Sequence, residues 1–352
     1  MAELLEYLKR AVTDRASDLF IVAGGLVSEK VEGHIRPISS EKAFPPETER
    51  LISHIYELAG RPMERYHATG DDDFSFAVSG LARFRVNAYR QRGSLAAVVR
   101  VVAFEIPDWK ALHIPEAVME LANVAHGMVL VTGTAGSGKS TTQACIIDQI
   151  NRTREAHIIT LEDPIEFLHR DQKSIVSQRE IAIDTADYLS ALRACLRQAP
   201  DVIQLGEMRD HDTIRTAMTA AETGHLLIAT LHTKGAVNTI DRIIDSFPPA
   251  QQAQVRVQLS MVLHTVVSQQ LLPDRNGGLV PAYELMHLNS AIRSMIRDSK
   301  THQIAGAIAA GGGEGMVTMD QSILALYQAG QITLDTALDY ADNPEQLRRR
   351  IG

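Results

Sequence analysis

The hydrophobic period of the first hundred residues changes repeatedly, which is typical of a small mixed α/β domain. Leu4, Leu8 and Val12 recur at helical spacing, and residues 45–60 predict a second helix that starts after prolines and closes at a glycine. Alternating apolar and polar positions predict strands at 18–24, 29–38, 73–78, 82–91 and 94–103. We therefore expect an antiparallel sheet with helices in this part of the chain.

The pattern changes from about residue 118. Near-continuous apolar runs, typical of strands buried on both faces of a parallel sheet, occur at 127–133, 156–163, 201–207 and 225–232. Helical segments separate them, which is the α/β pattern. Past Leu271 we expect mostly helices, among them one over 318–330 that starts with a Thr318/Gln321 capping pair.

Length and pattern together predict two domains. The chain has 352 residues, too many for one ordinary core. We expect a first domain over 1–104, a linker over 105–117 that holds two prolines and the only tryptophan, and a second domain over 118–352. The fold class is therefore α/β, a mixed N-terminal domain followed by a second domain with a parallel sheet and a helical C-terminal part.

Composition excludes several classes of protein. With 45% hydrophobic and 22% charged residues the chain is globular, and a net charge of −8 argues against a general binder of nucleic acid or anionic membranes. No apolar run is long enough to span a bilayer, and the acidic N-terminus lacks a signal-peptide core. Two cysteines are too few for a four-cysteine zinc site. We expect a cytoplasmic protein.

The stretch "VTGTAGSGKSTT" fits the P-loop pattern. An apolar strand precedes it and a helical segment follows, so a chance glycine turn is the weaker interpretation. Glycines let successive N–H groups face a phosphate, and the helix N-terminus adds partial positive charge. Lys139 would reach the β- and γ-phosphates of ATP and Ser140 would ligate Mg²⁺. The predicted phosphate-binding residues are Gly133, Thr134, Ala135, Gly136, Ser137, Gly138, Lys139, Ser140 and Thr141.

Acidic residues follow two other apolar runs. Glu162 and Asp163 end one strand, and Glu207 ends another that resembles a Walker B strand with Gly-Glu in place of Asp. Carboxylates at strand ends beside a P-loop are where metal and attacking water are held. The alternative is a helix-capping or solvated pair. Gln204, inside the second strand, has no explanation from the sequence.

Two histidines mark the ends of one predicted strand. His225 and His232 are too far apart to share a metal ion, and an isolated histidine is usually structural. His232 is the better catalytic candidate because it lies at the carboxyl end of its strand, where ligands bind in such sheets.

Arginines provide the remaining candidates. Strand alternation places Arg83 and Arg85 on one face of residues 82–91. A solvated sheet face is the simpler interpretation, but such residues beside an ATPase also fit arginine fingers acting on a neighbouring subunit. Further candidates for nucleotide contact are Arg193, Arg197 and Arg209.

The ordered set of motifs resembles the PilT/PilU-like retraction ATPases of type IV pili, a branch of the type II/IV secretion ATPase superfamily. "GTAGSGKSTT" is similar to their Walker A loop, "LEDPIEF" to their aspartate box and "GEMRD" to the end of their Walker B strand. "GHLLIATLHT" is similar to their histidine box, and "AIRSMIRDSKTHQI" resembles the segment associated with retraction. The resemblance runs nearly end to end.

This resemblance implies a PAS-like N-terminal domain, a RecA-like ATPase domain and a homohexameric ring with ATP between subunits. Glu162 would be the base that polarises water, although Glu207 would share that role or support Mg²⁺. His225 and His232 would sense the γ-phosphate or stabilise the interface. Implied partners are an inner-membrane platform protein and, as a further candidate, a paralogous retraction ATPase. The ring would lie at the cytoplasmic face of the inner membrane.

The sequence departs from the family pattern in places. Thr134-Ala135 replaces the usual Pro-Thr, at positions that contribute backbone donors. Ser294, Met295 and Asp298 alter the retraction segment, whose apolar stripe persists, so we expect that helix to pack. PilT-type and PilU-type assignments both stay open.

Three rival functions remain at this stage. A pilus-extension or type II secretion ATPase is disfavoured by the absent zinc site, and a regulatory ring with weak hydrolysis is the second rival. A nucleic-acid motor is disfavoured by the acidic charge and by the lack of aromatic-basic segments.

Overall fold

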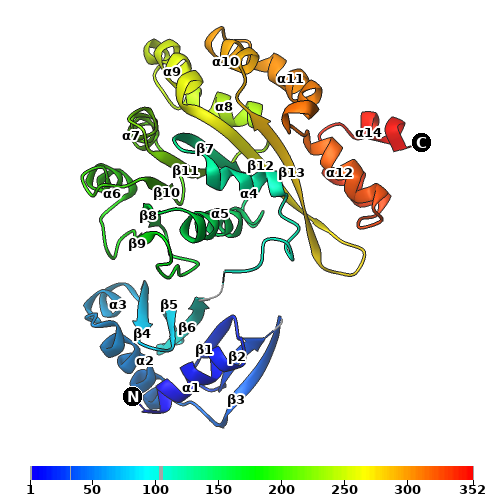
Figure 1. The fold of residues 1–352 in the computed structure, drawn as a ribbon. Helices are drawn as coiled ribbons and strands as arrows, with labels where there is room; N and C mark the ends of the chain where they lie inside the picture. The colour runs from blue at the N-terminus through cyan, green and yellow to red at the C-terminus, as the bar shows by residue number, and fades with distance from the viewer. Residues whose placement is uncertain (1, 32, 103–105, 352) are drawn as a thin grey trace. The chain divides into compact units, whose positions relative to one another are not determined.

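The computed structural model describes residues 2–31, 33–102 and 106–351, which form two compact units (Figure 1). The first unit is Met1–Glu105 with Glu166–Leu168, and the second is Ile106–Ile165 with His169–Gly352. The expected boundary at 104–105 lies outside the described residues, and the expected domain limits stay a prediction.

The first unit is an antiparallel sheet with helices packed on it, as expected. The strand order is β3-β2-β1-β6-β5-β4. Its elements are α1 (Ala2–Thr13), β1 (Asp18–Ile21), β2 (Leu26–Val31), β3 (His34–Lys42), α2 (Pro45–Ala59), α3 (Glu64–Thr69), β4 (Asp71–Val78), β5 (Ala82–Gln91) and β6 (Ser94–Val102). Helix α2 ends at Gly60, whose φ of 59° is the left-handed conformation that glycine adopts without steric cost. Helix α3 was not predicted.

The second unit contains a seven-stranded sheet in the order β13-β12-β7-β11-β10-β8-β9, parallel except for β13, which is antiparallel to β12. The strands are β7 (Gly127–Thr132), β8 (His157–Glu162), β9 (Ile175–Glu180), β10 (Val202–Leu205), β11 (Leu226–Leu231), β12 (Leu263–Pro273) and β13 (Leu279–His287). The helices are α4 (Glu116–Met119), η1 (Glu120–Asn123), α5 (Lys139–Thr153), α6 (Tyr188–Cys195), α7 (His211–Glu222), α8 (Ala236–Asp245), α9 (Pro249–Val262), α10 (Ser290–Arg297), η2 (Thr301–Gln303), α11 (Ile304–Ala310), η3 (Gly311–Glu314), α12 (Met319–Gln328), α13 (Leu334–Tyr340) and α14 (Pro344–Ile351).

Helices cover both faces of this sheet, which explains the continuous apolar runs. Along β7, Met128 and Leu130 face a core shared with helices α6 to α11, whereas Val129 and Val131 face a core shared with α4 and α5. A smaller core joins α12, α13 and α14 to one end of the β12–β13 hairpin. The α/β fold class and the apolar strands are therefore confirmed.

The chain past Leu271 is less helical than expected, because β13 follows and pairs with β12 over nine residue pairs. The expected helix near 318–330 is confirmed. Its Thr318 Oγ1 accepts from the Gln321 N–H at 3.2 Å, and Gln321 Oε1 accepts from the Thr318 N–H at 2.9 Å. Within 2–31, 33–102 and 106–351, no helix combines the length and apolar character needed to cross a bilayer.

Candidate nucleotide-binding site

The register of the parallel strands brings the predicted site residues to one edge of the sheet. Leu231 of β11 lies opposite Thr132 of β7, and Leu205 of β10 lies opposite Leu161 of β8. The glycine loop, His232, Glu207 and Glu162 follow or end these four strands. They therefore share the carboxyl edge, where open α/β sheets bind ligands.

The glycine loop is pressed against strand β12. Gly133 has a φ of 145°, and a Cβ there would collide with the Gln269 backbone oxygen and the Ser137 hydroxyl. Gly138 is the N-cap of α5 with a φ of 86°, in the left-handed region. Glycine is therefore required at 133 by space and favoured at 138 by backbone conformation.

Lys139 is the first residue of α5 and is only 8% exposed. Its ammonium donates to the carbonyl oxygens of Gly133 at 3.0 Å and Thr134 at 2.7 Å. The cation is thus held inside the curve of the loop, next to the positive end of a 15-residue helix. Ser140 and Thr141 follow in the same first turn. This arrangement suits an anion.

Glutamine side chains fix the glycine loop and helix α5. Of these glutamines, Gln204 alone was singled out from the sequence. Gln269 of β12 is 1% exposed and donates to the Ser137 carbonyl. Gln204 of β10 lies 3.4 Å from the Gln143 amide of α5, which in turn donates to the Leu205 carbonyl at 3.3 Å. Gln204 thus joins β10 to the phosphate-binding helix. In the sequence, polar residues adjoin Gln269 within an otherwise apolar strand, and this pattern indicates that it has a buried polar partner.

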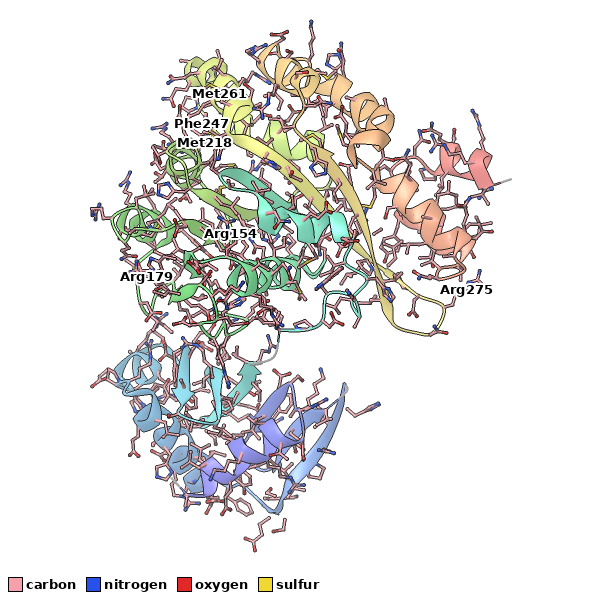
Figure 2. All side chains as sticks on the ribbon, viewed as in Figure 1. Arg154, Arg179, Met218, Phe247, Met261 and Arg275 are labelled. Carbon is pink, nitrogen blue, oxygen red and sulfur yellow. The ribbon has the colours of Figure 1, made fainter. Side chains whose placement is uncertain are left out.

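The other end of α5 is held as well. Arg154, labelled in Figure 2, donates to the Ala122 carbonyl at 3.1 Å and to the Val124 carbonyl at 2.9 Å. The helix is therefore fixed at both ends, so the loop at its N-terminus has a defined position.

Glu162 and Glu207 are both 8% exposed, and different partners orient them. Glu162 Oε1 accepts from the Thr160 hydroxyl at 2.6 Å and from the Gln178 amide at 3.1 Å. Glu207 pairs with the Arg209 guanidinium, and its other oxygen lies 3.3 Å from His232 Nε2. The structure thus joins three of the predicted residues, Glu207, Arg209 and His232, in one cluster.

Tyr188, which sequence reasoning missed, explains the glycine before Glu207. A Cβ at Gly206 would lie 2.6 Å from the Tyr188 hydroxyl and 3.3 Å from the Leu161 carbonyl. Burial raises the pKa of Tyr188, and the nearby carboxylates of Glu207 and Asp163 raise it further. The tyrosine is therefore neutral and presents a hydroxyl beside the acidic cluster.

His225 is not brought to this edge. It lies at the amino end of β11, where its Nδ1 is 2.9 Å from the Ala220 carbonyl and 3.2 Å from the Thr223 hydroxyl. Arg193 and Arg197 are exposed near the C-terminal end of α6, where the Gln198 carbonyl that follows contacts the first residue of β8. These three residues lie away from the glycine loop, and their roles stay predictions.

Arg83 and Arg85 belong to the first unit. Strand β5 alternates as expected, with Phe84 and Val86 fully buried and both arginines partly exposed. Arg85 binds Asp73 through two bonds, at 3.2 Å from Nε and 2.6 Å from Nη2. A fixed, partly exposed guanidinium is compatible with either interpretation of this face.

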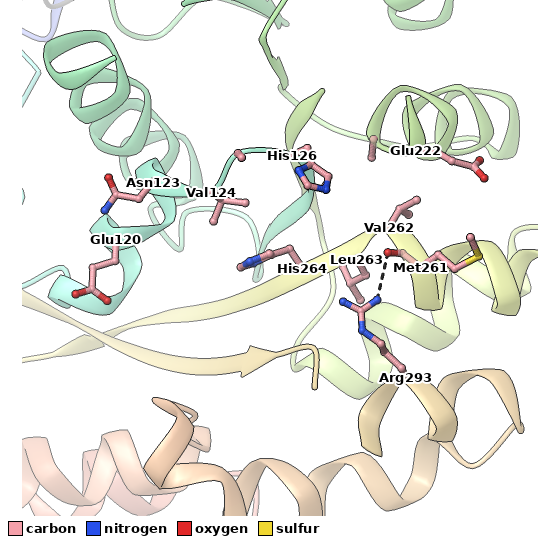
Figure 3. A pocket seen from close by; sticks show the side chains of 13 residues that line it. Glu120, Asn123, Val124, His126, Glu222, Met261, Val262, Leu263, His264 and Arg293 are labelled. Atoms are coloured by element: carbon pink, nitrogen blue, oxygen red, sulfur yellow. Dashed lines mark hydrogen bonds between the residues drawn. The ribbon is translucent and has the colours of Figure 1, made fainter. Parts of the chain in front are cut away.

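A cavity of about 220 Å³ adjoins the first turn of α5. Gly138 and Thr141 form one side, and Ile114, Leu271 and Tyr283 contribute apolar walls. A larger cavity of about 580 Å³ lies at the opposite edge, beside the start of β7 (Figure 3). The smaller cavity is the one that adjoins the phosphate-binding loop.

The segment that resembles the retraction motif forms α10. Ile292 and Ile296 are fully buried and Met295 packs against the same core, which confirms the expectation that this helix packs. Arg293 donates to the carbonyls of Ser260 at 2.6 Å and Met261 at 3.2 Å, at the C-terminal end of α9 (Figure 3). Arg293 therefore ties α10 to α9.

The chain is similar to known proteins over nearly its whole length. A family model described as type II/IV secretion system protein matches residues 2–311. The type IV pilus retraction ATPase PilT of Pseudomonas aeruginosa is 42% identical over 345 residues, 97% of this chain and 99% of the relative. The type IV pilus ATPase PilU of the same organism is 37% identical over 351 residues, 99% of this chain and 91% of the relative.

A crystal structure of the pilus retraction motor PilT with bound ADP resembles the fold with a TM-score of 0.90. The two are 45% identical, and the match covers 98% of each chain. The chain therefore belongs to the type II/IV secretion system protein family and is an ATPase homologous to the pilus retraction motor PilT.

Proposed function

We propose that this chain is the ATP-hydrolysing motor of type IV pilus retraction. The observation that carries the proposal is the glycine loop with Lys139, joined at one sheet edge by Glu162 and the Glu207–His232 pair. Near full-length similarity to a retraction ATPase supports the direction of the motor. The higher identity to PilT than to PilU supports a PilT-type assignment.

Within this proposal, Lys139 and the N–H groups of the loop hold the phosphates of ATP. The apolar cavity beside Thr141 receives the adenine base of ATP. The carboxylates of Glu162 and Glu207 and the Ser140 hydroxyl are oxygen donors at one edge of the sheet. Oxygen donors suit Mg²⁺, which keeps waters and takes phosphate oxygens. Ser140, Glu162 and Glu207 would hold Mg²⁺, directly or through water.

Glu162 is proposed as the base that polarises the attacking water. The Thr160 hydroxyl and Gln178 amide orient its carboxylate at the strand end. Glu207 would support the metal, and His232, whose Nε2 lies 3.3 Å from Glu207, would sense the γ-phosphate. Mg²⁺, when bound, neutralises charge that develops on the phosphates.

The proposed assembly is a homohexamer at the cytoplasmic face of the inner membrane, acting on a platform protein and beside a paralogous ATPase where one exists. In this ring Arg83 and Arg85 reach the nucleotide of a neighbouring subunit. Arg193, Arg197, Arg209 and His225 are further candidates for contacts across the interface.

Replacing Arg85 by alanine is expected to slow ATP hydrolysis at least about tenfold in the assembled ring, because a trans guanidinium stabilises the transition state. Turnover is measured after mixing Arg85→Ala subunits with Lys139→Ala subunits, whose own sites are inactive but whose arginines are intact. Recovery of activity on mixing supports the trans role. Arg50→Ala is the control, because Arg50 is exposed on α2 and pairs with the exposed Glu3. Equal slowing by both variants contradicts the proposal.

Imaging fluorescent pili in a strain that lacks only this protein tests the function. We expect long, numerous filaments that never shorten. A bald cell would instead assign the chain to filament extension, and normal retraction would contradict any motor role of its own.

A further inference from the structure

Glu284 is a buried carboxylate in β13. Its position is connected through paired residues of neighbouring strands to the end of β7, where the glycine loop begins. It lies opposite Ser268 of β12, and Ser268 lies opposite Thr132, the last residue of β7. Glu284 is 8% exposed and is not part of the proposed catalytic cluster. A buried carboxylate is costly unless it is compensated, so its partners indicate its purpose.

The partners of Glu284 are the N-termini of two helices. One oxygen accepts from the Ala236 N–H, the first residue of α8, at 2.7 Å. Next to Glu284, the Leu285 N–H donates to the Val317 carbonyl at 2.9 Å, two residues before Met319 begins α12, and the Met319 N–H lowers the pKa of the Glu284 carboxyl. Burial and the nearby Asp342 carboxylate raise the pKa of Glu284, and the N–H groups of Ala236 and Met319 oppose the rise. The positive ends of both helices thus meet on one side chain.

Helix α8 starts at Ala236, four residues after His232, so its N-terminus holds the end of the His232 loop, residues 232–235. The N-cap Gly235 has no side chain, and its own N–H donates to the Ser268 hydroxyl at 2.9 Å. Glu284 and Ser268 therefore anchor consecutive N–H groups of this loop. The 3.3 Å approach of His232 to Glu207 depends on where the loop is held.

We propose that Glu284 is a positioning residue that fixes the His232 loop and couples it to the C-terminal helices α12 to α14. The inference rests on the proposed function, because the loop matters when His232 faces a nucleotide. A change in the His232 loop on ATP hydrolysis would move the N-terminus of α8. The Glu284 carboxylate would transmit this movement to α12. Lys234 and the carboxylates of Asp320 and Asp342 are the charged groups nearest this junction.

The test compares variants of the full chain in ATP hydrolysis. Glu284→Leu removes both acceptors, Glu284→Gln keeps one, and Ser268→Ala removes the other anchor of the loop. We expect Glu284→Leu to lower kcat about tenfold because buried N–H groups lose their partner. We expect KM for ATP to stay within about twofold because Lys139 and its loop are untouched. Glu284→Gln and Ser268→Ala should give smaller losses of kcat.

Thr318→Ala is the matched control, because it removes the N-cap of α12 and leaves α8 untouched. It should lower the thermal midpoint without changing kcat. Hydrogen exchange over 319–328, with ADP or a non-hydrolysable ATP analogue, should differ between nucleotides in the wild type and not in Glu284→Leu.

Two outcomes separate the inference from the proposed function. Unchanged kcat in Glu284→Leu, with the thermal midpoint lowered as in Thr318→Ala, shows a merely structural cap and overturns the inference alone. A wild-type chain that does not hydrolyse ATP overturns both.

Discussion

Replacing Lys139 by alanine is expected to abolish ATP hydrolysis, with a loss of at least about 10³-fold in turnover. The ammonium is the fixed cation of the loop, held by the Gly133 and Thr134 carbonyls. Alanine keeps the helix but leaves the loop without a charge that stabilises the transferred phosphoryl group. Nucleotide binding should weaken as well, because in the proposed site the same cation would contact the ground-state phosphates.

Phosphate release under saturating ATP and Mg²⁺ measures this effect, with the thermal midpoint as a check on folding. Lys173→Ala is the control because Lys173 is exposed and lies outside the loop. Turnover near that of the wild type in Lys139→Ala would refute the site.

Glu162→Gln is expected to bind ATP with nearly unchanged affinity and to hydrolyse it about 10³-fold more slowly. Glutamine has almost the same shape, so strand β8 and the contact with Thr160 should survive. The amide cannot accept the proton of the attacking water, so the chemical step should stall with ATP bound.

Binding of labelled ATP and single-turnover hydrolysis separate the two effects. Glu166→Gln, an exposed glutamate four residues further on, is the control. Failure of Glu162→Gln to bind ATP would show that Glu162 holds the nucleotide or metal instead. If Glu207→Gln alone stalls hydrolysis after binding, the base is Glu207.

Much of the ATPase unit could be predicted because its determinants are local. A strand buried on both faces needs a continuous apolar run, and a phosphate loop needs glycines between strand and helix. The six-residue β11 also predicts that His225 and His232 lie at opposite edges, and the structure places them so.

What could not be predicted depends on contacts that are distant in the sequence. Helix α9 ends at Val262 and β12 begins at the next residue, Leu263. No glycine or proline at this junction marks the change from helical to strand periodicity. Gln269 contacts Ser137 across 132 residues, and Gln204 contacts Gln143 across 61. A polar residue in an apolar strand shows only that a partner exists; tertiary packing decides which one.

The two halves of the glycine loop differ in which amino-acid replacements they can accept. Gly133 abuts strand β12, so a larger residue there would have to displace the strand. Thr134 and Ala135 are exposed, whereas Gly136, also exposed, has a φ of 75° that favours glycine. The side chains at 134 and 135 can therefore change over evolutionary time while the backbone donors stay in place. Thr134-Ala135, where related motors carry Pro-Thr, is a change of this tolerated kind.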